Sequence, residues 1–154
     1  MNKPLEENLS REIAQQIKSK AKNSFDNTYK AALLNNSAKY VQGFLVMPGN
    51  PYKPIEHSWL EFEDYLVDPT LPHLNKNVAQ LYYFPAQRLS VKQVKAAVEE
   101  AIEDYPEDPP LPVYGAAPYE YYGDKMLGGR DYQAAYEEAL AKCRELKQAS
   151  SENN

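Results

Sequence analysis

Hydrophobic positions along this chain recur with two periods, one typical of helices and the other typical of strands. Near the N terminus, Leu9, Ile13 and Ile17 lie four residues apart among charged and amide residues, which predicts a helix over residues 5–21. A second apolar stripe at helical spacing predicts a helix over residues 24–34. The run KYVQGFLVMPG that follows is rich in β-forming residues and ends in turn residues, so it predicts a strand.

The segment EHSWLEFEDYLVDPT predicts a β-hairpin, because apolar and polar residues alternate on both sides of a turn at Glu63 and Asp64. The register pairs these residues: Phe62 with Tyr65, Leu60 with Val67, and Trp59 with Asp68. One face then carries His57, Trp59, Glu61, Leu66 and Asp68. The opposite, core-directed face carries Leu60, Phe62, Tyr65 and Val67. We therefore expect His57 and Asp68 to lie within hydrogen-bonding distance, unless the register shifts by one residue.

Two further elements follow the hairpin. Residues 79–84 predict a third strand, which we expect Pro85 to end. Ser90 and Gln93 have the spacing of a capping box, which predicts a helix from Val91 to about Asp104.

A last apolar stripe predicts a helix that starts near Asp131, and the polar residues 149–154 are expected to form a disordered tail. The order of elements predicts an α+β fold, with a small antiparallel β-sheet packed against N-terminal and C-terminal helices. A length of 154 residues with 43% hydrophobic residues fits one domain, which we place at residues 1–148.

Between the last two predicted helices lies a segment rich in proline and tyrosine, residues 105–129, which we call the strap. Its many prolines and glycines exclude long regular elements. The PPLP sequence within it is also typical of a proline-rich ligand for an aromatic groove. We favour an ordered strap whose tyrosines pack across the domain and over the region of Ser24 and His57, because detached linkers rarely carry so many aromatic residues.

Charge and cysteine content restrict the function. A formal net charge of -5 and a pI near 5.1, with both signs interspersed, argue against a nucleic-acid partner. No apolar run is long enough to span a bilayer, and the N terminus lacks the apolar core of a signal peptide, so we expect a cytoplasmic protein without a membrane partner. One cysteine, Cys143, excludes an internal disulfide and multi-cysteine zinc sites. No His or Cys cluster indicates a metal, and we expect no cofactor.

An H-x-W-x-E strand followed by a D-P-T strand resembles the histidine and aspartate strands of the transglutaminase-like and papain-like cysteine hydrolase superfamily, especially its small bacterial and phage members. In that superfamily a cysteine opens the helix before the sheet, in a C-aromatic-x-N run, and a YVEG strand precedes the histidine. This chain has SFDN at 24–27 and YVQG at 40–43, in the same order. The resemblance spans about residues 20–72. It implies a papain/transglutaminase-like core with a Ser24, His57 and Asp68 set, and activity on an amide or thioester.

The departure from the family pattern falls on the nucleophile, because Ser24 stands where the pattern has cysteine. A cysteine at a helix N terminus beside a histidine ionises readily, whereas a serine needs a general base and an aligned oxyanion site. Three interpretations of Ser24 follow: a natural loss of activity, an engineered inactivating substitution, or a true serine hydrolase.

Structural interpretations compete with these. His57 and Asp68 could form a purely structural hydrogen bond, and Ser24 could be a helix N-cap. Glu61 is expected to be a surface or ion-pairing residue, Trp59 a wall or core residue, His73 a loop histidine without a visible partner, and Cys143 a small buried hydrophobe. Two function classes stay open: a cysteine-peptidase-like hydrolase or acyl-transferase, and an inactive relative whose cleft and strap bind a peptide or protein. The sequence does not indicate an oligomeric state.

Overall fold

A computed structural model describes residues 3–152 of the chain. The helices are α1 (Glu7–Ile17), α2 (Ser24–Leu33), α3 (Val91–Asp104) and α4 (Arg130–Glu152), with short 3-10 turns η1 (Leu71–His73) and η2 (Val78–Gln80). The strands are β1 (Lys39–Val46), β2 (Ile55–Glu61), β3 (Leu66–Val67), β4 (Tyr82–Ser90), β5 (Tyr119–Tyr122) and β6 (Lys125–Gly128).

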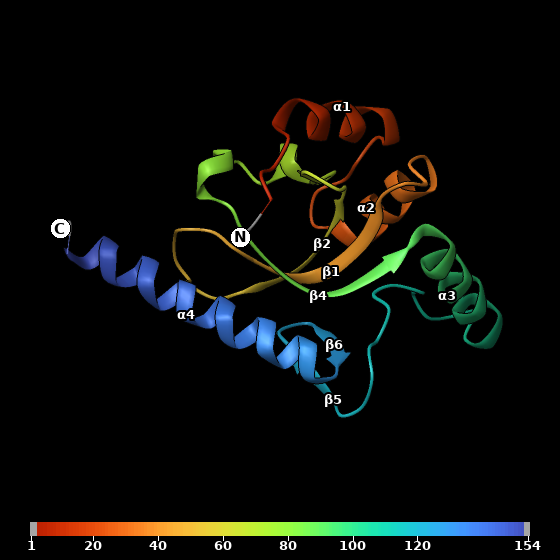
Figure 1. Ribbon diagram of the computed structural model, residues 1–154. Coiled ribbons are helices and arrows are strands. Elements are labelled where there is room, and N and C mark those ends of the chain that lie inside the picture. Colours follow the sequence, from red (N-terminus) through yellow and green to blue (C-terminus); the bar gives the residue numbers. More distant parts are fainter. Residues whose placement is uncertain (1–2, 153–154) are drawn as a thin grey trace.

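The strands form an antiparallel sheet in the order β3-β2-β1-β4 and a separate β5–β6 hairpin. In Figure 1, α1 and α2 lie above the sheet, and α4 and the β5–β6 hairpin lie below it. This arrangement is the predicted α+β fold, in which N-terminal and C-terminal helices pack with an antiparallel sheet.

The β2–β3 hairpin has the predicted register, with Leu60 opposite Val67. Trp59 and Leu66 belong to one buried cluster, whereas Leu60 and Val67 belong to another that also contains Ile13 of α1. The predicted alternation is therefore confirmed, although both faces of the hairpin are buried rather than one. Burial on both faces fixes the register, because a slip of one residue would exchange the two sets.

Strand β4 differs from its prediction. The sequence placed a strand at residues 79–84 and ended it at Pro85, but β4 runs through Pro85 as far as Ser90. The ladder with β1 shifts register between Gln42, which pairs with Gln87, and Gly43, which pairs with Pro85, so that β4 bulges at Ala86. A bulge on an edge strand tolerates a residue without an N–H. A Cβ atom at Gly43 would lie 2.1 Å from the carbonyl oxygen of Phe84, so the close approach requires glycine.

The predicted capping box is present at the start of α3. The Ser90 hydroxyl accepts a hydrogen bond from the Gln93 N–H at 3.1 Å, and the Gln93 side chain accepts one from the Ser90 N–H at 2.8 Å. Helix α1 is shorter than the predicted 5–21, because Lys18 adopts a left-handed conformation (φ 57°) and its N–H bonds back to the last turn.

Helix α4 begins at Arg130, beside the predicted start at Asp131. Its stripe of Tyr132, Ala135, Ala139 and Cys143 is buried against the sheet and the β5–β6 hairpin. The helix continues to Glu152, so residues 149–152 of the expected disordered tail are helical, and residues 153–154 lie outside the described part of the chain. Once a helix has formed, each further residue that is fixed adds one hydrogen bond, so extending a helix costs less than nucleating one.

The strap lies against the domain, as expected, and it contains regular structure that the sequence did not reveal. Leu111 is buried among residues of α2, α3 and β1, while Tyr122 and Leu127 of the β5–β6 hairpin pack with Phe44 of β1. The hairpin strands are short, so proline and glycine on both sides do not prevent them. The strap is therefore part of the core rather than a detached linker.

Gln42, in the centre of β1, attaches the strap to the sheet. Its side chain is fully buried, accepts a hydrogen bond from the Val113 N–H at 2.8 Å, and donates one to the Val113 carbonyl at 2.8 Å. It also accepts from the Tyr40 hydroxyl at 3.0 Å and bonds with the Tyr132 hydroxyl of α4 at 2.8 Å. One amide thus joins β1, the strap and α4 in a network whose polar atoms are satisfied.

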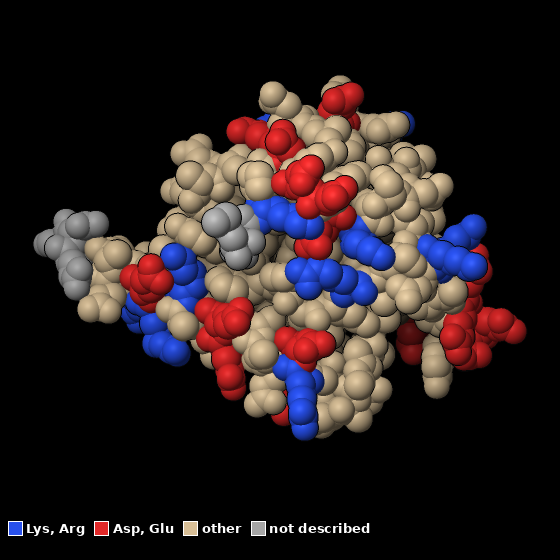
Figure 2. Space-filling model, viewed as in Figure 1, with Lys and Arg blue, Asp and Glu red and all other residues tan. Residues whose placement is uncertain are grey.

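Acidic and basic side chains are interspersed on the face shown in Figure 2. Among the helices within residues 3–152, none is long and apolar enough to cross a membrane.

Candidate functional site

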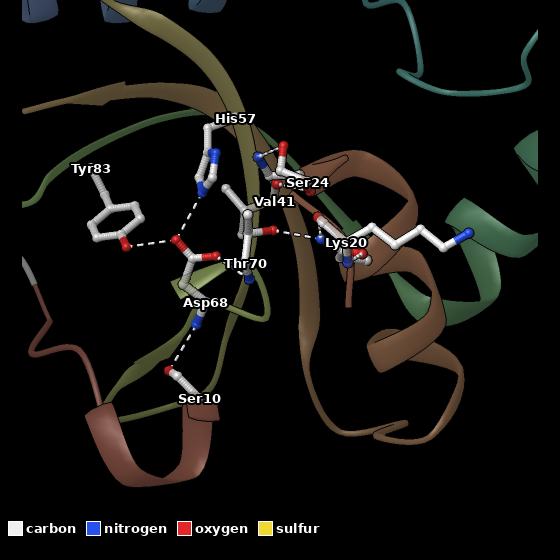
Figure 3. Close-up of polar contacts among 10 residues, drawn as sticks. Ser10, Lys20, Ser24, Val41, His57, Asp68, Thr70 and Tyr83 are labelled. Carbon is white, nitrogen blue, oxygen red and sulfur yellow. Dashed lines mark hydrogen bonds and ion pairs between the residues drawn. The ribbon is translucent and has the colours of Figure 1, made fainter. Parts of the chain in front are cut away.

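The centre of the site is a buried pair of side chains from the β2–β3 hairpin. His57 Nε2 lies 2.7 Å from Asp68 Oδ2, so the predicted hydrogen bond is confirmed. Asp68 follows directly after the short strand β3, and its side chain is fully buried. Figure 3 shows the imidazole of His57 directed at this carboxylate.

Three donors surround the Asp68 carboxylate. Besides His57, the Tyr83 hydroxyl donates to Oδ2 at 2.7 Å and the Thr70 N–H donates to Oδ1 at 2.9 Å (Figure 3). The Asp68 N–H in turn donates to the Ser10 hydroxyl of α1 at 3.0 Å. A buried carboxylate is costly unless it is hydrogen-bonded, and here both oxygens have partners. The aspartate is therefore fixed in position and can fix the histidine ring.

Aromatic rings complete the surroundings of His57. The Trp59 ring stacks near the imidazole with centroids 6.2 Å apart, and the Tyr83 ring lies at the same distance. Burial, followed by the negative charge of Asp68, raises the pKa of the Tyr83 hydroxyl well above its ordinary value, so this group remains a donor at physiological pH. Trp59 is a core residue, as expected, and also a wall for the histidine.

Ser24 is the first residue of α2 and is not its N-cap, so the interpretation of Ser24 as a cap is wrong. The N-cap is Asn23, and its side chain makes no capping hydrogen bond. The Ser24 hydroxyl instead accepts a hydrogen bond from the N–H of Ser58, the residue after His57, at 3.3 Å. This contact brings the N terminus of α2 to the middle of β2.

Ser24 and His57 line the same cleft but are not hydrogen-bonded to each other. The cleft has a volume of about 710 Å³, and the first turn of α2 forms one of its walls. With Nε2 bonded to Asp68, the other ring nitrogen of His57, Nδ1, has no hydrogen-bond partner among the described residues. The first N–H groups of a helix have no intrahelical acceptor, so this wall also carries partial positive charge.

Asn27 holds the loop before α2 against the aspartate segment. Its side chain is buried, accepts a hydrogen bond from the Lys20 N–H at 3.0 Å, and donates to the Lys20 carbonyl at 2.8 Å. It also donates to the Thr70 hydroxyl at 2.9 Å, which connects α2 with the residues that hold Asp68. Asn27 of the SFDN run and Thr70 of the DPT run are thus hydrogen-bonded to each other across the site.

The strap supplies part of the cleft wall. Pro109, Leu111, Asp124 and Lys125 all line the cleft together with Ser24. This placement agrees with the expectation that the strap packs over the region of Ser24 and His57.

Glu56 connects the tip of the β5–β6 hairpin with the cleft. Its carboxylate accepts a hydrogen bond from the Lys125 N–H at 3.3 Å. Burial is the largest cause of a raised pKa at this carboxyl. The contact links the strap to β2 at the residue before His57.

The remaining singled-out residues have structural surroundings. Glu61 pairs with Arg88 at 3.0 Å, as expected for an ion-pairing residue. Cys143 is buried on α4, and burial raises the pKa of its thiol. His73 is not without a partner, since its Nε2 lies 3.1 Å from the Ser19 hydroxyl and 3.0 Å from the Ser19 carbonyl.

Sequence reasoning missed several residues that build the site, chiefly Tyr83, Thr70 and Asn27. Asn27 is the last residue of the SFDN motif and Thr70 is the last residue of the DPT motif, so these two motifs are the sequence signal that could have identified both residues. Tyr83 lies on β4, and only the pairing of β4 with β1 brings it to the site. Within residues 3–152, no group of His, Cys, Asp and Glu could hold a metal ion.

Comparisons with protein-family models, with curated proteins and with solved structures gave no match.

Proposed function

We propose that the cleft is a cysteine-hydrolase-type site that carries serine at the nucleophile position, and that the protein binds a peptide or another amide-containing chain there without turning it over. The observation that carries this proposal is the position of His57: Asp68 holds Nε2, Nδ1 has no hydrogen-bond partner within residues 3–152, and His57 lines the same cleft as Ser24. A histidine whose only role was to donate a hydrogen bond to the buried Asp68 carboxylate would not need to line a cleft.

The contacts of Asp68 support a positioning role. Its three donors leave the carboxylate little freedom, so the ring of His57 is held in one orientation. A fixed histidine at the N terminus of a helix is the arrangement that lowers the pKa of a cysteine thiol. The site is thus built for a thiolate, which this chain lacks at position 24.

The contacts of Ser24 argue against efficient catalysis by its hydroxyl. A serine nucleophile has to give its proton to a base during attack, and that base must lie within hydrogen-bonding distance. The hydroxyl oxygen accepts from the Ser58 N–H, and His57 does not bond it. A serine at this position therefore keeps the shape of the cleft but does not provide an effective nucleophile.

The second candidate is a hydrolase or acyl-transferase that uses Ser24 directly. The intact His57–Asp68–Tyr83 network favours it, because a binding module has no need for an oriented histidine. A substrate that displaced the Ser58 N–H from Ser24 would free the hydroxyl for His57. The two candidates differ in whether the unmodified protein turns over substrate.

Hydrolysis assays separate these possibilities. The unmodified protein, Ser24→Cys and the Ser24→Cys/His57→Ala double variant would be tested with an activated ester, a thioester and a fluorogenic peptide amide. We expect no turnover by the unmodified protein, turnover by Ser24→Cys, and loss of that gain in the double variant. Ser37→Cys, at an exposed site, controls for the reactivity of any added thiol.

Turnover by the unmodified protein that His57→Ala abolishes would support the second candidate instead. A Ser24→Cys protein no more active than Ser37→Cys would refute the assignment of the site.

A further inference from the structure

A second cavity, of about 590 Å³, lies between α3 and the strap. Ala97, Glu100, Ala101 and Asp104 line it from α3, at spacings of three and four residues that place them on one stripe of the helix. The neighbouring stripe, with Val94 and Val98, is buried in the core. Helix α3 therefore packs with one stripe and leaves the adjacent stripe facing the cavity.

Tyrosines form much of the rest of this cavity. Tyr105, Tyr114 and Tyr119 line it, and their exposed fractions are 67%, 52% and 51%. The rings of Tyr114 and Tyr119 meet edge to face with centroids 6.4 Å apart. Large apolar groups gathered at a surface hollow mark interaction sites more often than scattered single residues do.

The charge of the cavity lining is of one sign. Glu100, Asp104 and Asp108 line it, whereas Lys and Arg are absent from its described lining. None of these three carboxylates takes part in an ion pair within residues 3–152. At the right of the view in Figure 2, acidic side chains lie over the lower part of the α3 region, and basic side chains lie just above them. We call this site the acidic aromatic groove, defined by Glu100, Asp104, Asp108, Tyr105, Tyr114 and Tyr119.

We propose that the acidic aromatic groove binds a basic peptide segment, one that carries arginine or lysine next to proline or other apolar residues. The positive head group would pair with the carboxylates and lie on a tyrosine face, which is the preferred site for a cation near an aromatic ring. The aliphatic stem and its apolar neighbours would pack on Pro110, Pro112 and Met126 of the lining. The charge of the groove repels nucleic acid and anionic lipid.

The walls of the groove are held in place before any partner arrives. Leu111 of the strap is buried in the core, and Val113 is bonded twice to the Gln42 side chain, so the segment that carries Tyr114 is attached to the sheet. A fixed wall lowers the entropic cost of binding. The proposal does not depend on Ser24 or His57, neither of which lines this groove.

Fluorescence polarisation with labelled synthetic peptides tests the proposal. The probes are short peptides with two arginines among proline, leucine and alanine, and matched peptides in which citrulline replaces each arginine. Citrulline is close to arginine in size but is uncharged, and a carbonyl acceptor replaces one NH2 donor group of the guanidinium. We expect the arginine peptides to bind at least about tenfold more tightly, and their affinity to fall as salt is raised.

Variants of the groove locate the binding. We expect Glu100→Lys/Asp104→Lys and, separately, Tyr114→Ala to weaken the arginine peptides at least about fivefold. Matched controls are Glu138→Lys and Tyr121→Ala, exposed residues of the same types outside the groove. Circular dichroism of every variant checks that it is folded.

Equal binding of arginine and citrulline peptides would overturn the proposal, as would binding that the groove variants do not change or the absence of binding by any arginine peptide. Loss of binding in Glu138→Lys as large as in the groove variants would indicate a general charge effect and would also overturn it.

Discussion

Replacing Gln42 with leucine should detach the strap from the sheet. Leucine is close to glutamine in size and suits a buried strand position, but it can neither accept from the Val113 N–H nor donate to the Val113 carbonyl. Tyr132 keeps a partner, because its hydroxyl also donates to Gln87 at 2.6 Å. The loss therefore falls on the two backbone groups of Val113 and on the hydroxyl of the fully buried Tyr40, which donates to Gln42 at 3.0 Å.

The size of the effect follows from these three groups. A polar group left buried without a partner costs about 1–3 kcal/mol. Val113 is only partly buried, so water recovers some of the loss. We expect Gln42→Leu to lower the free energy of unfolding by about 2–4 kcal/mol.

Urea denaturation followed by circular dichroism measures this stability change, and hydrogen exchange shows where the structure loosens. Amides of residues 109–114 should exchange faster in Gln42→Leu, while those of α1 change little. Gln15→Leu, an exposed glutamine of α1, is the control and should change stability by less than about 0.5 kcal/mol. An unchanged unfolding midpoint together with unchanged exchange in residues 109–114 would refute the role assigned to Gln42.

Three further changes test other parts of the structure. Tyr83→Phe removes one donor to Asp68 and should lower the free energy of unfolding by about 1–2 kcal/mol in urea denaturation; no loss would mean that this hydrogen bond is not made. Asn27→Ala removes the bonds to the loop before α2 and should lower stability by about 2–3 kcal/mol and speed hydrogen exchange in residues 18–23, whereas unchanged exchange there would contradict this contact. Because burial raises the pKa of Glu56 above its usual 4.5, the folded state holds this proton more tightly than the unfolded state, so the stability it contributes is lost as pH rises from about 4.5 through the folded pKa. Glu56→Gln should therefore flatten the fall of the urea midpoint in that pH window, and an identical pH profile in both proteins would exclude a raised pKa.

The sequence predicted those elements whose signals are local. The capping box of Ser90 and Gln93 sets the start of α3 within four residues of chain, and alternation set the register of the β2–β3 hairpin. Each strand of the hairpin has alternating residues that pack on opposite faces of the sheet, so a shift of one residue would place them on the wrong faces. The remaining register brings His57 next to Asp68. Local patterns therefore predicted the centre of the candidate site.

Features that depend on contacts between distant segments could not be predicted. Pro85 lies within β4 because a bulge in the β1–β4 ladder beside Gly43 accommodates it. The local sequence around Pro85 does not indicate how β4 pairs with β1. Gln42 reads as a polar residue within a strand, and its role exists only because Val113 of the strap lies over it. Tyr83 similarly reaches Asp68 only through the pairing of β4 with β1. Each case requires the tertiary structure.

The central claim is that Ser24 occupies the nucleophile position of a site built for a thiolate. Three features around it would stabilise a thiolate in Ser24→Cys: the N terminus of α2, the Ser58 N–H that now bonds the hydroxyl, and His57 in the same cleft. The new thiol should therefore have a pKa well below the reference of about 8.5.

The rate of alkylation by iodoacetamide as a function of pH measures that thiol pKa directly. We predict fast alkylation of Ser24→Cys at mildly acidic pH, a return toward free-thiol behaviour in Ser24→Cys/His57→Ala, and slow reaction of the buried Cys143 in every protein. An introduced cysteine that reacts no faster than a free thiol, and is indifferent to His57, would contradict the account and leave the hairpin as plain structure.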